Sequence, residues 1–141
     1  MTDLPDPRSP LRSPPPGAAL RVLVVDDEAA VGSAIARLLR PIPVVFAQSA
    51  TGALGRITAG GHFDAILCDL NMPGMSGLKF YEAVEACAPR LARRIVFVTG
   101  SAASRELEEL RRRTGCRCLE KPFQGADLKA AVAAVAGGDP G

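Results

Sequence analysis

The sequence predicts an α/β fold in which a parallel sheet of five strands carries helices on both faces. Five short runs rich in apolar residues alternate with segments whose apolar residues recur at helical spacing. Four of the runs contain four consecutive apolar residues, which is typical of strands buried on both faces. Right-handed crossovers between such strands place the intervening helices on both sides of the sheet. The expected strands are residues 20–25, 43–47, 63–68, 94–98 and 116–119.

The length and composition are those of a single globular domain. The chain has 141 residues, 48% of them hydrophobic, which is enough for a buried core without disulfides or a structural metal. The formal net charge of +2 does not call for nucleic acid or an acidic membrane as a partner. No apolar stretch approaches the roughly 20 residues that span a bilayer, and the first residues do not resemble a secretion signal. We therefore expect a cytoplasmic protein.

The chain is expected to consist of a folded region between two terminal segments. Six of the 12 prolines fall within residues 1–18, and because proline removes backbone donors, a disordered proline-rich arm is expected there. Pro7 and Pro10 have the spacing of a PxxP ligand, although a solvated tail is the simpler interpretation. The predicted domain covers residues 19–136, and the glycine-rich residues 137–141 are expected to fray.

The helices follow from apolar spacing and from helix-breaking residues. The first is expected to begin after a cap at Asp26 or Asp27 and to end before Pro41. Acidic residues precede basic ones along residues 106–113, which suits a solvated helix better than a nucleic-acid patch. The other expected helices are residues 49–57, 78–86, 103–113 and 126–135. The inward side chains of the first and third helices are expected to be Val31, Ile35, Leu38, Leu39, Leu78, Tyr81 and Val84.

Polar residues stand at the C-terminal ends of four predicted strands. They are Asp26, Asp27, Asp69, Thr99 and Lys121. Ligands of parallel α/β sheets bind in the crevice beyond these strand ends, so the five side chains are expected to converge. Three carboxylates in one crevice repel one another unless a cation intervenes. Mg²⁺ prefers oxygen ligands of this kind, and Mn²⁺ is the alternative metal.

The same residues permit phosphoryl transfer. Asp69 is the candidate nucleophile and would form an aspartyl phosphate. The Lys121 ammonium and the Thr99 hydroxyl would each stabilise a phosphoryl oxygen. Pro122 would hold the backbone of Lys121. A cis peptide bond between Lys121 and Pro122 could orient the lysine toward the phosphoryl group. The only histidine, His62, precedes the third strand and is therefore expected at the opposite edge of the sheet from Asp69. No strong base is then available to activate water for hydrolysis. The phosphoaspartate is therefore expected to persist.

Each residue taken alone has a simpler interpretation. Asp26 and Asp27 could only cap a helix, and Asp69 could be a turn residue before residues 71–74. The four cysteines match no zinc spacing and fit small buried side chains better. The joint occurrence at four strand ends is what favours a functional site.

Four segments together resemble the receiver domains of two-component response regulators. They are Val-Asp-Asp-Glu at 25–28, Asp-Leu-Asn-Met-Pro-Gly-Met-Ser-Gly at 69–77, Val-Thr-Gly at 98–100 and Glu-Lys-Pro-Phe at 120–123. The resemblance covers residues 20–136 and implies a flavodoxin-like fold with strand order 2-1-3-4-5. It implies that Asp69 is phosphorylated. It also implies that Asp26, Asp27, Asp69 and the backbone carbonyl of Asn71 bind the metal. Thr99 and Lys121 match the family's switch hydroxyl and phosphate-binding lysine.

The resemblance also implies partners and modulating residues. The phosphoryl donor would be a phosphohistidine on a sensor histidine kinase or a phosphotransfer protein, and the output would be a protein contact. Asn71 and Ser101 would tune the lifetime of the phosphate. The family often has Tyr or Phe three residues before the lysine, where this chain has Cys118. A thiol is too small for the same movement of a ring, so the chain departs from the family's usual switch there.

Several functions remain open to the sequence alone. The leading hypothesis is a stand-alone phosphoacceptor module that is not an enzyme acting on other substrates, and a variant is the terminal receiver of a hybrid histidine kinase. A phosphatase of the haloacid-dehalogenase type also uses an aspartyl phosphate, but it needs D-x-D after its first strand, where this chain has Asp26-Asp27-Glu28. A flavin or nucleotide binder on the same fold lacks its glycine-rich motif here.

Overall fold

The structure is a computed structural model that describes residues 20–100 and 105–136. The expected arm at residues 1–18, the expected frayed end at residues 137–141 and Ser101 lie outside the described residues. Within them, no helix is long and apolar enough to cross a membrane.

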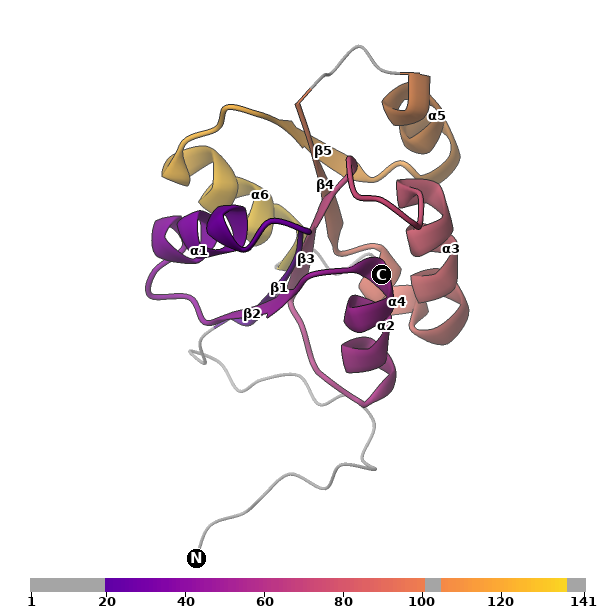
Figure 1. The fold of residues 1–141 in the computed structure, drawn as a ribbon, viewed down its shortest axis with the longest axis horizontal. Coiled ribbons are helices and arrows are strands. Elements are labelled where there is room, and N and C mark those ends of the chain that lie inside the picture. Colours follow the sequence, from indigo (N-terminus) through magenta and orange to yellow (C-terminus); the bar gives the residue numbers. More distant parts are fainter. Residues whose placement is uncertain (1–19, 101–104, 137–141) are drawn as a thin grey trace, which may run out of the picture.

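A sheet of five parallel strands forms the centre of the molecule, and its order is β2-β1-β3-β4-β5 (Figure 1). This confirms the predicted order. The central strands β1, β3 and β4 are buried along their whole length, as their continuous apolar sequences predict, whereas the edge strand β5 is half-exposed. The strands are β1 (Val22–Val25), β2 (Val44–Ala47), β3 (Ala65–Asp69), β4 (Ile95–Thr99) and β5 (Arg117–Glu120).

Helices cover both faces of the sheet (Figure 1). Helices α1 and α6 pack on one face, and α2, α3, α4 and α5 pack on the other. Alternate residues of each strand enter the two cores, so Leu23 packs toward α2–α5 while Val24 packs toward α1 and α6. The helices are α1 (Ala29–Leu38), α2 (Ala50–Thr58), α3 (Gly77–Cys87), α4 (Pro89–Ala92), α5 (Arg105–Thr114) and α6 (Gly125–Ala136).

The start and the inward face of α1 differ from the prediction. The N-cap residue is Glu28, whose side chain makes no capping bond, so the prediction that Asp26 or Asp27 caps the helix is wrong. Asp26 instead accepts a hydrogen bond from the Glu28 backbone N–H at 2.9 Å, inside the turn before the helix. Leu38 is 38% exposed, because the buried stripe of the helix runs through Ile35 to Leu39.

Helix α3 also has a different inward face, and α4 was not predicted. The buried stripe of α3 is Gly77, Phe80 and Val84 at spacings of three and four residues, whereas Leu78 and Tyr81 are only half-buried. The first buried position of the stripe is a glycine, which does not count as an apolar residue in the sequence pattern. The apolar pattern of this face therefore becomes visible only at Phe80, one turn after the helix begins. Pro89 at the first position of α4 pre-sets the single turn that precedes β4.

Candidate functional site

The carboxyl ends of four strands bring the predicted residues to one edge of the sheet. Asp26 directly follows β1, Asp69 ends β3, Thr99 ends β4 and Lys121 directly follows β5. The parallel register places these ends level, since Val25 pairs with Cys68, Asp69 with Val98 and Thr99 with Glu120. The predicted convergence of these side chains therefore holds at the level of the fold.

Asp69 is a nearly buried carboxylate held between two donors. Its side chain is 6% exposed. Its Oδ1 accepts a hydrogen bond from the Asn71 backbone N–H at 2.9 Å, and its Oδ2 lies 3.8 Å from the Lys121 Nζ. The Lys121 side chain is itself one-third exposed, so the ammonium stands at the mouth of the crevice. This arrangement fixes one carboxylate oxygen in the turn and leaves the other beside a positive charge.

A second acidic group lies after β1 and includes Glu28, which was not among the predicted site residues. Carboxylate oxygens of Asp26, Asp27 and Glu28 all lie within 4.8 Å of one another. Asp26 is buried, whereas Asp27 and Glu28 are exposed. Glu28 is the third residue of the acidic run at 26–28, and this run is the sequence feature from which its place in the cluster could have been predicted. The prediction instead grouped Asp26 and Asp27 with Asp69, which lies outside this tight cluster.

Electrostatic repulsion at Asp26 indicates a place for a cation. Burial raises the pKa of the Asp26 carboxyl, and the neighbouring Asp69 and Asp27 raise it further. The hydrogen bond from Glu28 and the Lys121 ammonium act in the opposite direction without cancelling the rise. A divalent cation with oxygen ligands relieves such repulsion, and the donors present are the hard oxygens that Mg²⁺ and Mn²⁺ prefer. The residues therefore fit the expected metal.

Thr99 and Lys121 are linked through the backbone. Thr99 is 3% exposed, and its carbonyl accepts a hydrogen bond from the Lys121 N–H at 2.7 Å. The Lys121-Pro122 peptide bond is cis, as the sequence analysis considered. Lys121, directly after β5, therefore lies beside the end of β4. On the other side of the site, the backbone N–H of Asn71 donates to the Asp69 carboxylate.

Comparison with known proteins decides the family. The family model described as "Response regulator receiver domain" matches residues 22–133, which is most of the chain. The chain belongs to the response regulator receiver domain family. Its members are signalling modules of two-component systems, and they interact with histidine kinases and downstream targets.

Relatives and solved structures agree with this family. The chain is 33% identical over 121 residues to the transcriptional regulatory protein FixJ of Azorhizobium caulinodans, covering 84% of the chain and 56% of FixJ. It therefore spans little more than half the length of that relative. It is 27% identical to the chemotaxis protein CheY-3 of Vibrio cholerae, covering 78% of the chain and 86% of CheY-3. A receiver domain structure from Clostridium thermocellum superposes with a TM-score of 0.73 at 27% identity, covering 84% and 94% of the two chains.

Two residues singled out in the receiver sequence lie away from the acidic crevice. Cys118 is half-buried on the α5 side of β5 and pairs in register with Phe97, two residues before Thr99. Its Sγ lies 3.6 Å from the Cys116 carbonyl oxygen. His62 lies before β3 at the opposite edge, as predicted, and its Nε2 is 3.4 Å from Asp64 Oδ1.

Proposed function

We propose that this receiver accepts a phosphoryl group from a phosphohistidine onto the carboxylate of Asp69. The observation that carries the proposal is the position of this nearly buried carboxylate, 3.8 Å from the Lys121 ammonium and beside the acidic group after β1. In the transfer, an Asp69 oxygen forms a bond to phosphorus while the bond between phosphorus and the donor imidazole breaks. The leaving imidazole takes up a proton.

The chain's own residues divide this work in the proposal. Lys121 neutralises charge on the phosphoryl oxygens from the mouth of the crevice, and the Thr99 hydroxyl donates to another of those oxygens. Asp26, Asp27, Asp69 and the backbone carbonyl of Asn71 would hold Mg²⁺ or Mn²⁺. Glu28 is added to these candidates because it completes the carboxylate cluster. When bound, the metal supplies charge neutralisation for the incoming phosphoryl group.

The product is proposed to be a signal and not a turnover intermediate. Fast hydrolysis of an aspartyl phosphate is favoured by a base that activates water, and the only histidine of the chain, His62, lies at the opposite edge of the sheet. The phosphorylated receiver would then act through a protein contact or pass the phosphoryl group onward, in the cytoplasm. That the receiver acts without an attached output domain stays a prediction, as do the boundaries 19–136.

The test is phosphorylation by a small donor. The full chain is incubated with phosphoramidate and Mg²⁺, and its intact mass is followed for the wild type and for Asp69→Asn and Asp127→Asn. Asp127 is an exposed carboxylate on α6, so its variant controls for loss of a charge. A gain of one phosphoryl group that requires Mg²⁺ and Asp69, but not Asp127, supports the proposal. Fast turnover of p-nitrophenyl phosphate with no phosphorylated chain would point to a phosphatase and contradict it.

A further inference from the structure

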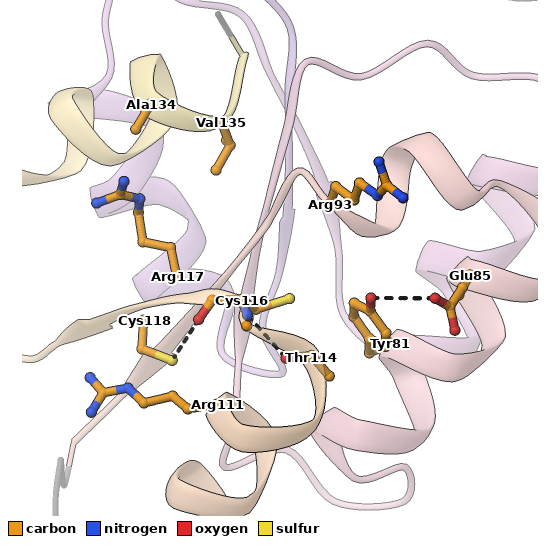
Figure 2. A pocket seen from close by; sticks show the side chains of 11 residues that line it. Tyr81, Glu85, Arg93, Arg111, Thr114, Cys116, Arg117, Cys118, Ala134 and Val135 are labelled. Carbon is orange, nitrogen blue, oxygen red and sulfur yellow. Dashed lines mark hydrogen bonds between the residues drawn. The ribbon is translucent and has the colours of Figure 1, made fainter. Parts of the chain in front are cut away.

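A groove lies at the edge of the sheet opposite to Asp69. It has a volume of about 990 Å³, and Figure 2 shows the side chains around it. The residues that line it come from the middle and the end of α3, from the last turns of α5 and α6, and from the segment before β4. Others come from the segment before β5 and from the first half of that strand. The groove is therefore separate from the acidic crevice, because it lies where the strands begin and not where they end.

Three arginines line this groove, and they come from three different elements. Arg93 precedes β4, Arg111 is in the last turn of α5 and Arg117 begins β5. All three are exposed, and within the described ranges none forms an ion pair. Among the described residues of the lining, the one carboxylate is Glu85, which lies 3.5 Å from the Tyr81 hydroxyl and offsets one of the three positive charges (Figure 2). The groove consequently carries an excess of unpaired positive charge.

The neighbouring arginines of α5, unlike the three in the groove, have a carboxylate partner. Arg112 and Arg113 lie 4.0 and 3.9 Å from the carboxylate of Glu109 on their own helix, and they do not line the groove. The dipole of α5 explains why a basic residue is favourable at Arg111. The helix dipole does not explain Arg117, because this residue is in a strand. The feature that Arg93, Arg111 and Arg117 share is their position in the lining of the groove.

The uncharged part of the lining can contact a ring. Tyr81 is half-buried, and its pKa is raised by burial and by Glu85, so the phenol stays neutral near pH 7. The thiols of Cys116 and Cys118 and the side chain of Val135 complete a weakly polar wall. Ligand sites commonly combine such a wall with a few polar groups in a cavity of about 300–1,000 Å³.

We propose that this groove binds a small phosphorylated ligand with two or more phosphate groups, of the nucleotide or polyphosphate class. Guanidinium groups are suited to phosphate because their paired N–H donors match its oxygens. Three of them spread around one groove suit several anionic groups better than a single phosphate. The proposal is independent of phosphorylation at Asp69, since the two sites lie at opposite edges of the sheet.

The test is direct binding to the full chain in EDTA, so that no divalent metal links a phosphate to the acidic crevice. ATP and tripolyphosphate are titrated by calorimetry at low salt, and backbone amide shifts locate the site. We expect saturable binding to both, with shifts at residues 115–118 and Tyr81 and none at Asp69. Tighter binding of ATP than of tripolyphosphate would assign a nucleotide, and equal binding a polyphosphate.

Matched variants assign the binding to the three arginines. Each of Arg93→Ala, Arg111→Ala and Arg117→Ala should weaken binding about tenfold, as expected for loss of a hydrogen bond to a charged group. Arg112→Ala removes the same charge from α5 and should leave the affinity unchanged. Arg117→Lys keeps the charge but loses the paired donors, so it should give an intermediate affinity.

Three outcomes would overturn the proposal. One is the absence of saturable binding to both probes at millimolar concentration. Another is an equal loss of affinity in Arg111→Ala and Arg112→Ala, which would mean a diffuse effect of net charge. The third is tighter binding of hexaglutamate than of either probe, which would identify the groove as a docking site for an acidic segment of a protein. Circular dichroism and thermal melts of the same variants show that each is folded.

Discussion

The Nζ of Lys121 lies 3.8 Å from the Oδ2 of Asp69, and this ion pair joins the end of β3 to the residue that follows β5. The lysine is fixed at its backbone as well, because its N–H donates to the carbonyl of Thr99. One residue is thereby coupled to the proposed nucleophile and to the proposed switch residue. Because Asp69 is nearly buried and Lys121 is one-third exposed, water screens their attraction only in part.

The first prediction concerns competition between this lysine and a metal ion. Lys121→Met removes a positive charge beside the acidic residues, so the affinity for Mg²⁺ should rise, by about threefold to tenfold. Phosphorylation by phosphoramidate at saturating Mg²⁺ should nevertheless slow by about tenfold or more, because charge on the phosphoryl oxygens is no longer neutralised. Calorimetric titration and intact mass measure the two effects.

Lys129→Met is the matched control for that prediction. Lys129 is an exposed lysine on α6, so its loss changes the net charge equally without touching the crevice. Its Mg²⁺ affinity and its phosphorylation rate should match the wild type. An unchanged Mg²⁺ affinity in Lys121→Met would mean that the ammonium does not act on the metal site.

The second prediction uses the raised pKa of Asp26. Because burial raises this pKa above its unfolded value of about 3.8, the folded protein holds the proton more tightly than the unfolded chain. The contribution of Asp26 to stability is therefore fully present below pH 3.8 and is lost as the pH rises through the folded pKa. In EDTA at pH 7, Asp26→Asn should raise the melting temperature by about 2–4 °C, since it removes this cost.

Metal should reverse the order of stability for the same variant. Added Mg²⁺ should stabilise the wild type more than Asp26→Asn, because at a given Mg²⁺ concentration tighter binding to the folded state raises its melting temperature more. Thermal melts with EDTA and with Mg²⁺, each recorded at several pH values, measure both effects. A melting temperature of the variant below that of the wild type in EDTA would show that the ionised Asp26 is not a source of strain.

Most of the site could be predicted because its residues directly follow strands that the apolar pattern identifies. The continuous apolar runs of β1, β3 and β4 mark buried parallel strands, and the residues directly after them must then share one edge. Asp69 and Lys121 are 52 positions apart in the chain and still meet for this reason. Topology alone was sufficient to bring them together.

What escaped prediction depends on local geometry that no apolar pattern records. Glu28 joins the acidic cluster because the turn after β1 folds back, with Asp26 accepting from the Glu28 N–H, and this moves the helix start past both aspartates. Phe80 is buried instead of Leu78 because a glycine opens the buried stripe of α3. In both places a backbone feature decides which side chain faces inward.

The third prediction tests that glycine. A Cβ at Gly77 would overlap Leu70 Cδ2 and lie 3.2 Å from Phe97 Cε1, in the core beside Asp69. Gly77→Ala should therefore destabilise the fold by about 1–3 kcal/mol through overpacking, although alanine is the better helix former. Gly55→Ala, in α2 with no atom near the added Cβ, should stabilise the protein by about 0.5–1 kcal/mol. Urea unfolding of both variants measures the contrast, and a stable Gly77→Ala would show that Leu70 can move aside.

The last prediction concerns the order in which the thiols react. Cys87 is exposed, whereas burial raises the pKa of Cys116 and Cys118 and raises that of the fully buried Cys68 most strongly. Because the thiolate is the reactive form, labelling by iodoacetamide near pH 7.5 should be fastest at Cys87 and slowest at Cys68.

A substitution of Arg111 distinguishes the effect of its charge on the reactivity of Cys118 from the effect of access to the thiol. The Arg111 guanidinium lowers the pKa of this thiol, partly offsetting burial, so Arg111→Ala should slow its labelling by a few-fold although the variant opens the site to reagent. Arg112→Ala removes a charge from the next position of α5 and should leave the rate unchanged. Peptide mass spectrometry over a pH series reports each cysteine separately. Faster labelling in Arg111→Ala would mean that access, and not the charge of the guanidinium, governs the reactivity of Cys118.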